Sequence, residues 1–177
     1  MKRRRLLSGA LAGSTAIAVG GSVAWLNVEA SDAPLDIDST LAILDQLSKA
    51  SITTIGEWNL FQIYSHCAQS VEYSMTGYPQ HKSEFFKSTI GPMAFSVFSE
   101  KRKMRHGLSE AIPGAPAIAV QGNMDQALER FKKSLIDFKN YKGELQPHFA
   151  YGPLSKAEYE LAHAMHFQNH LEEFKTT

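Results

Sequence analysis

Apolar residues recur every three or four positions along most of the chain after residue 30, whereas strand-like alternation is nearly absent. Residues three and four apart lie on one face of an α-helix, so this spacing predicts helices that each bury one side. Five helices are predicted, at residues 38–50, 56–76, 83–104, 124–141 and 155–174. Gly91-Pro92 is expected to kink or split the third of them. The pattern therefore predicts an all-α bundle.

A long connection, residues 105–122, joins the third and fourth predicted helices. It contains the apolar residues Ile112, Ile118 and Val120, which predict an ordered segment rather than a polar linker. Long crossover connections of this kind occur in some four-helix bundles. We therefore expect a four-helix core with one long crossover and one extra helix.

The first thirty residues have the organisation of an export signal. Four basic residues at positions 2–5 precede an apolar run rich in Ala, Gly, Leu and Val. The segment ends in Val28-Glu29-Ala30, a small-x-small pattern typical of a cleavage site. We therefore expect residues 1–30 to be a signal peptide and residues 31–177 to form a periplasmic domain.

The basic segment also resembles the twin-arginine motif, through Arg3-Arg4-Arg5-Leu6-Leu7. It departs from that motif at Lys2, Leu6 and Ser8, where Ser or Thr, Phe and Lys are usual. A core interspersed with Gly and Ser suits the twin-arginine route, by which proteins cross the membrane folded. The alternative is an uncleaved inner-membrane anchor, because residues 6–26 are about long enough to span a bilayer.

Charge and cysteine content narrow the functional classes. The formal net charge is zero, but residues 1–30 hold four of the 18 Lys and Arg and one of the 18 Asp and Glu. The remaining body therefore has a net charge of −3, which gives no electrostatic case for binding nucleic acid or anionic lipid. Membrane contact is expected only through an uncleaved N-terminal segment, and homodimer formation stays open. Cys67 is the only cysteine, so no intrachain disulfide forms, and we expect it to be a small buried hydrophobe.

The predicted closing helix carries three of the seven histidines, His163, His166 and His170. Positions i, i+3 and i+7 share one helix face, so the three imidazoles form a stripe. His166 and His170 stand one turn apart, the spacing at which two imidazole nitrogens reach one metal ion. The alternative for this pair is two solvent-facing surface histidines. A metal site inside a helical bundle is the leading hypothesis.

His66 lies in the second predicted helix, within a polar stripe that runs along an otherwise apolar sequence: Asn59, Gln62, His66, Ser70 and Tyr73. Such a stripe either faces solvent or faces inward. If it faces inward, His66 completes a site of three imidazoles with His166 and His170. Three protein ligands with a position left for water or substrate are typical of catalytic rather than structural metal sites.

The other histidines have weaker predicted roles. His163 is a candidate to orient a ligating imidazole through a hydrogen bond, with ligation and simple burial as alternatives. His148 lies in the turn before the closing helix, where it caps the bundle end or supports the site in the same way. His81 and His106 have polar or basic neighbours, and we expect both to be solvated.

Four segments together resemble the DinB-like (YfiT-like) superfamily of metal-dependent four-helix bundles, and within it a branch of proteins of unknown function. The first two are His66 with the turn Gly77-Tyr78-Pro79, and Ile112-Pro113-Gly114-Ala115-Pro116. The others are the turn 148–154 and His166-x-x-x-His170-Leu171 with Phe174. The resemblance covers roughly residues 36–175. Asn169 and Glu172-Glu173 depart from the branch, which often has histidine and Arg-Gln at these places.

This resemblance implies a DinB-like bundle of up-down-down-up topology and a divalent metal held by His66, His166 and His170. Zinc, nickel and iron all suit imidazole ligands. Relatives in the superfamily use the metal to activate a low-molecular-weight thiol, and hydrolysis by metal-activated water is the other reaction that such a site permits. Export argues against the thiol reaction, because the periplasm is oxidising. The sequence thus predicts a metal-dependent hydrolase or transferase of unknown substrate, or else a non-catalytic metal-binding or interaction protein of the cell envelope.

Overall fold

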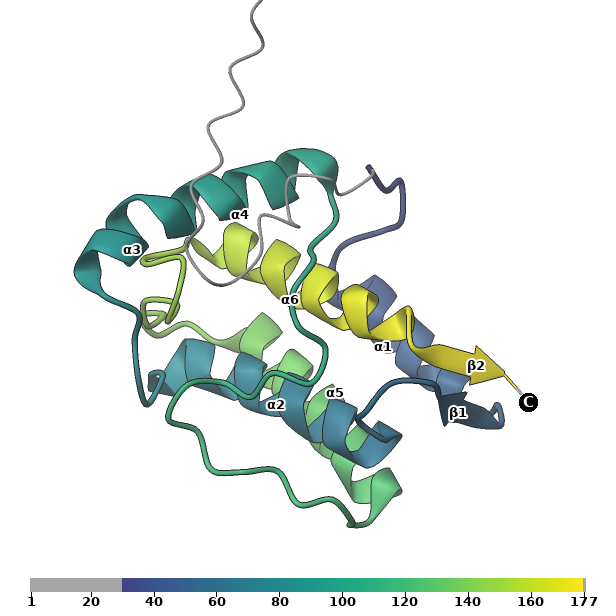
Figure 1. Ribbon diagram of the computed structural model, residues 1–177. Coiled ribbons are helices and arrows are strands. Elements are labelled where there is room, and N and C mark those ends of the chain that lie inside the picture. The colour runs from purple at the N-terminus through teal and green to yellow at the C-terminus, as the bar shows by residue number, and fades with distance from the viewer. Residues whose placement is uncertain (1–29, 177) are drawn as a thin grey trace, which may run out of the picture.

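The computed structural model describes residues 30–176 (Figure 1). The export signal expected at residues 1–30 therefore lies almost wholly outside the described residues. The described chain contains six helices and two short strands. In order they are α1 (Ile37–Leu47), β1 (Ile52–Thr54), α2 (Leu60–Thr76), α3 (Glu84–Ser88), α4 (Ile90–Lys101), α5 (Met124–Asn140), α6 (Lys156–Leu171) and β2 (Phe174–Thr176). Within residues 30–176, no helix is long and apolar enough to cross a membrane.

The expected split of the third helix is confirmed, but it falls at Thr89 rather than at Gly91-Pro92. Pro92 instead occupies the first turn of α4, where its missing N–H has no intrahelical acceptor to lose. Phe85 on the short helix α3 is 70 % exposed, so the apolar pattern there does not mark a buried face. The 83–104 region thus forms two helices, of which only α4 contributes buried residues.

The prediction of a purely helical domain is corrected at the C-terminus. The closing helix ends at Leu171 instead of near residue 174, and β2 pairs with β1 as an antiparallel two-stranded sheet. Thr54 pairs with Phe174 and Ile52 with Thr176. Three-residue strands are too short to show an alternating pattern, and these two come from distant parts of the sequence. The described chain is mostly helical with one small sheet.

Helix α6 is the central element of the packing. On one side, Phe167 and Tyr159 join a core formed with α2 and α5, in which Phe131, Leu135 and Phe138 are almost completely buried. The predicted apolar face of α5 is thus confirmed. On the other side of α6, its residues Ala162, Ala164 and Met165 pack with Ala94, Phe95 and Phe98 of α4. Burial on two sides explains why α6 can carry inward-facing polar groups.

The expected long connection between the third and fourth predicted helices is present as residues 102–122, and it forms neither helix nor strand. It descends from the end of α4, passes α6 and then runs beside α2 (Figure 1). Two side-chain hydrogen bonds fasten it: the His106 N–H donates to Asn169 Oδ1 at 3.0 Å, and Asn59 Nδ2 donates to the Val120 carbonyl at 2.7 Å. The connection is therefore an ordered strap over α2 and α6.

Candidate metal centre

Both helices of the candidate site begin at a reciprocal capping box, which fixes where each helix starts and so which residues share a face. In α2, the Asn59 side chain accepts from the Gln62 N–H while the Gln62 side chain accepts from the Asn59 N–H. In α6, Ser155 and Glu158 make the same pair of bonds. A cap of this type satisfies two helix-end donors at once.

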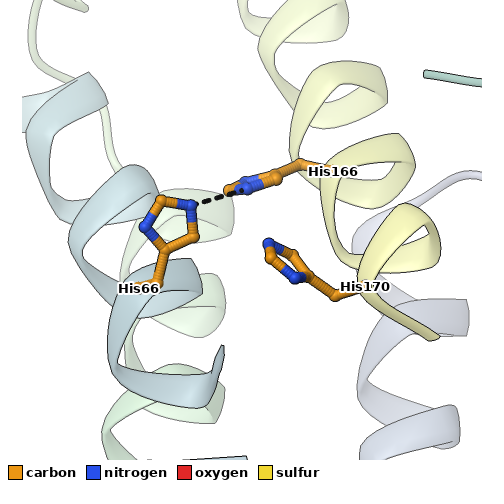
Figure 2. Close-up of side chains that lie close together, drawn as sticks. All are labelled: His66, His166 and His170. Carbon is orange, nitrogen blue, oxygen red and sulfur yellow. Dashed lines mark hydrogen bonds between the residues drawn. The ribbon is translucent and has the colours of Figure 1, made fainter. Parts of the chain in front are cut away.

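Three imidazoles meet between these helices: His66 from α2, and His166 and His170 from α6. Figure 2 shows their rings pointing toward one another across the gap between the helices. One ring nitrogen from each lies within 4.8 Å of those of the other two. The Nε2 atoms of His66 and His166 are 3.0 Å apart, a hydrogen-bond distance that requires one ring to carry a proton on Nε2. The ring centroids are 4.9–5.4 Å apart.

The site is shielded from water and poor in hydrogen bonds. His66 is 4 % exposed, His170 is fully buried, and His166 is half-buried. The Nδ1 atom of His66 and both ring nitrogens of His170 are buried without a hydrogen-bond partner. Burial lowers the pKa of His66 to about 3 and that of His170 to about 2, and neighbouring imidazoles add to both shifts. Burial and the neighbouring imidazoles also hold the pKa of His166 well below its ordinary value. All three rings are therefore neutral near pH 7, the state in which imidazole binds a metal ion.

This arrangement fits a divalent metal ion. Around a tetrahedral zinc with bonds of about 2.0–2.1 Å, ligand nitrogens lie roughly 3.3 Å apart. The observed separations, 3.0 Å for one pair and no more than 4.8 Å for the others, need only side-chain adjustments to reach that spacing. An ion would also give the unpartnered nitrogen of His170 a bond in place of the missing hydrogen bond. Three imidazoles would leave at least one coordination position free.

The polar stripe of α2 faces inward, which rules out the alternative that it faces solvent. Gln62, His66 and Ser70 are all less than 9 % exposed. Trp58, just before α2, covers the site from the same side: its ring packs edge-on against His66 and stacks at 6.3 Å on His170. The aromatic ring helps to exclude water from the imidazoles.

The two histidines proposed to support the site lie elsewhere. His163 is buried, and its Nε2 is 3.2 Å from Ser74 Oγ rather than from any of the three imidazoles. The His148 Nδ1 accepts hydrogen bonds from the backbone N–H groups of Ala150 and Tyr151, so it closes the turn before α6. Burial lowers the pKa of both rings to about 3. Their contacts are those of packing and turn closure.

The expectation that His81 and His106 are both solvated is right for His81, which is exposed, and wrong for His106. The strap brings the His106 ring against His166 and His170, with centroids 4.8 Å and 5.3 Å apart. Its Nε2 is buried without a partner, and burial lowers its pKa. A histidine in a loop has no periodicity to reveal its direction. The available signal was that it lies in a connection already predicted to be ordered.

A cavity of about 570 Å³ opens beside His106, and none of the three clustered imidazoles lines it. His106 and Asn169 form part of its wall, and Arg105, Glu57 and Glu173 contribute charged groups. Burial raises the pKa of the Glu173 carboxyl, and the nearby Glu57 adds to this shift. The cavity therefore gives a polar small molecule a place next to His106, which separates it from the three imidazoles.

Comparison with known proteins assigns a family but no activity. A family described as "Protein of unknown function (DUF1569)" matches residues 33–177. No curated protein and no solved structure matches the chain. The matched residues include all the histidines of the candidate site.

Proposed function

The chain belongs to the DUF1569 family, and we propose that it is an exported protein that binds one divalent metal ion through His66, His166 and His170. One observation carries the proposal: three neutral imidazoles from two packed helices present nitrogens within 4.8 Å of one another. Buried polar groups normally have hydrogen-bond partners, so a cluster of unpartnered ring nitrogens needs an explanation. A metal ion supplies it.

We further propose that the site serves a hydrolase or transferase reaction on a small polar substrate held in the adjacent cavity. A divalent ion with a free position lowers the pKa of a bound water or thiol, which is the chemistry it would contribute. The protein's own contribution is to keep the three rings neutral and Trp58 over them, and to hold charged Arg105, Glu57 and Glu173 at the cavity wall. The bundle would then be of the DinB-like, up-down-down-up type.

The alternative function is metal binding without catalysis, in a protein of the cell envelope. It is favoured by one observation: among the described residues, no carboxylate is hydrogen bonded to any of the three imidazoles. Metal-binding histidines of enzymes usually donate their second N–H to a carboxylate or carbonyl group. A screen of esters, amides and phosphate esters with metal-loaded protein separates the two functions, because the alternative predicts no turnover that depends on the three histidines.

Elemental analysis of protein purified without a histidine tag tests metal binding. Wild-type protein should carry about one equivalent of zinc, nickel or iron, and His66→Ala, His166→Ala and His170→Ala should each lose it. His81→Ala is the matched control, since His81 is exposed. His163→Ala should keep its metal, because His163 bonds to Ser74. Metal-free wild-type protein that also binds no added Zn²⁺ would overturn the proposal.

Export rests on the sequence of residues 1–30 and needs its own test. Fractionation of cells that make the full-length chain should place the protein in the periplasm or on the periplasmic face of the inner membrane. Intact mass then distinguishes cleavage after Ala30 from an uncleaved anchor. Replacement of Arg3 and Arg4 by Lys should block export if the twin-arginine route is used. Recovery of an uncleaved, soluble cytoplasmic form would contradict export without affecting the metal site.

A further inference from the structure

The His106 ring lies as close to His166 and His170 of α6 as the ring of the candidate ligand His66 does. Its ring centroid lies 4.8 Å from that of His166 and 5.3 Å from that of His170. The corresponding distances from His66 are 4.9 Å and 5.4 Å. By ring centroids, His106 therefore approaches the pair on α6 as closely as His66 does, although it is not one of the three residues whose ring nitrogens lie within 4.8 Å of one another.

The hydrogen bond made by Nδ1 of His106 leaves the other ring nitrogen, Nε2, with a lone pair that can bind a metal ion. The Nδ1 atom lies 2.8 Å from the Gly107 carbonyl oxygen, and because a carbonyl can only accept, Nδ1 carries the proton. In the neutral ring, Nε2 then has a free lone pair. That atom is buried and has no partner. An N–H donated to a carbonyl with the opposite nitrogen left free is the arrangement typical of metal-binding histidines.

We propose that His106 is a fourth protein ligand of the metal ion, bound through Nε2 and supplied by the strap. This inference rests on the proposed function, since it presupposes an ion at His66, His166 and His170. The ion would gain a bond from a nitrogen that otherwise has none. Ligation by four imidazoles would close the coordination sphere of a tetrahedral ion, whereas three leave it open.

The attachment of His106 makes this ligand displaceable. It belongs to a connection without helix or strand, and the backbone bond to Asn169 Oδ1 fastens it to α6 between His166 and His170. His106 and Asn169 also stand in the wall of the 570 Å³ cavity. A small molecule in that cavity would reach the ion by taking the place of His106. The strap would thus keep the metal site closed until such a ligand binds.

Nitrogen NMR of the wild-type protein tests the proposal directly. Metal-free protein labelled with ¹⁵N-histidine is titrated with Zn²⁺, and long-range ¹H–¹⁵N spectra report which ring nitrogens become coordinated. Four histidines should change at one equivalent, and His106→Gln should lack one of these four signals. Three coordinated histidines in wild type, or a fourth signal that persists in His106→Gln, would overturn the proposal. No coordinated histidine would instead contradict the proposed function itself.

Metal affinity gives a second, independent measurement. In competition with a chelator, His106→Ala should bind Zn²⁺ at least about tenfold more weakly than wild type, because it loses a ligand bond. Added imidazole should restore the affinity of His106→Ala by filling the vacated position, and it should not tighten binding in wild type. His81→Ala is the matched control for removal of an imidazole outside the site. Equal affinity of His106→Ala and wild type would exclude ligation by His106.

Discussion

Acidification of the metal-free protein should unfold it well above the pH at which carboxylates are protonated. Burial lowers the pKa of His66, His148 and His163 to about 3 and that of His170 to about 2, whereas a histidine in an unfolded chain titrates near 6.5. Below pH 6.5 the unfolded chain therefore binds protons that the folded protein does not. The free energy of unfolding is therefore highest, as far as these rings are concerned, above pH 6.5. It decreases progressively as the pH falls from 6.5 toward 3.

The size of the effect follows from the same shifts. One such histidine lowers the free energy of unfolding by about 1.4 kcal/mol for each pH unit below 6.5. Between pH 7.5 and pH 5.5 the four rings together account for about 5 kcal/mol. Local opening that hydrates a ring reduces this figure, so it is an upper bound. Because small domains are stable by only about 5–15 kcal/mol, the loss decides whether the protein stays folded.

Urea unfolding of chelator-treated protein, followed by circular dichroism at pH 7.5, 6.5 and 5.5, measures this slope. Replacement of one buried ring should reduce the slope by about one proton: His163→Gln is suitable, because its amide can still donate to Ser74 Oγ. The exposed His81→Ala variant should leave the slope unchanged. A free energy of unfolding that stays within about 1 kcal/mol across this range would show that the rings are protonated in the folded state, and would refute the reasoning.

Three further substitutions test the packing that positions the site, each by urea unfolding at pH 7.5. Phe131→Ala should cost about 3–5 kcal/mol, because this fully buried ring packs against Phe167 of α6; a cost below 1 kcal/mol would contradict the assigned core. Gly91→Ala should cost about 1–3 kcal/mol, since a Cβ there overlaps the carbonyl oxygen of Ala150 and one backbone must move; an unchanged midpoint would show that α4 does not lie against this turn. Ser155→Ala should cost about 1 kcal/mol through loss of the α6 cap, and Ser155→Asp should recover most of it.

Local signals in the sequence were sufficient for most of the fold. Helix periodicity identified the segments that became α1, α2, α5 and α6, and the predicted start of α6 at residue 155 is within one residue of the observed start at Lys156. The start of α2 was predicted four residues too early, although the Asn59/Gln62 capping box is a local signal for the observed start at Leu60. The absence of β1 from the prediction has a tertiary cause: β1 exists only because β2 returns from the far end of the chain to pair with it.

Some residues of the candidate site could likewise be predicted from local sequence, whereas others depend on tertiary contacts. The spacing of His166 and His170 on one helix face is a local property, and both were found from it. The direction of the His66 stripe is not local, because a polar stripe reads the same whether it faces solvent or a second polar surface. His66 faces the two imidazoles that α6 supplies, His166 and His170. The direction of the polar stripe on α2 could therefore be predicted only together with that of the histidine stripe on α6.

His106 shows where sequence reasoning stops and why. Its neighbours in the chain, Arg105 and Gly107, are exposed, so its burial owes nothing to a local pattern. His106 is half-buried, and one hydrogen bond from its backbone to Asn169, a residue 63 positions away on α6, holds it there. The Asn169 side chain thus fastens the strap so that the His106 imidazole lies against His166 and His170.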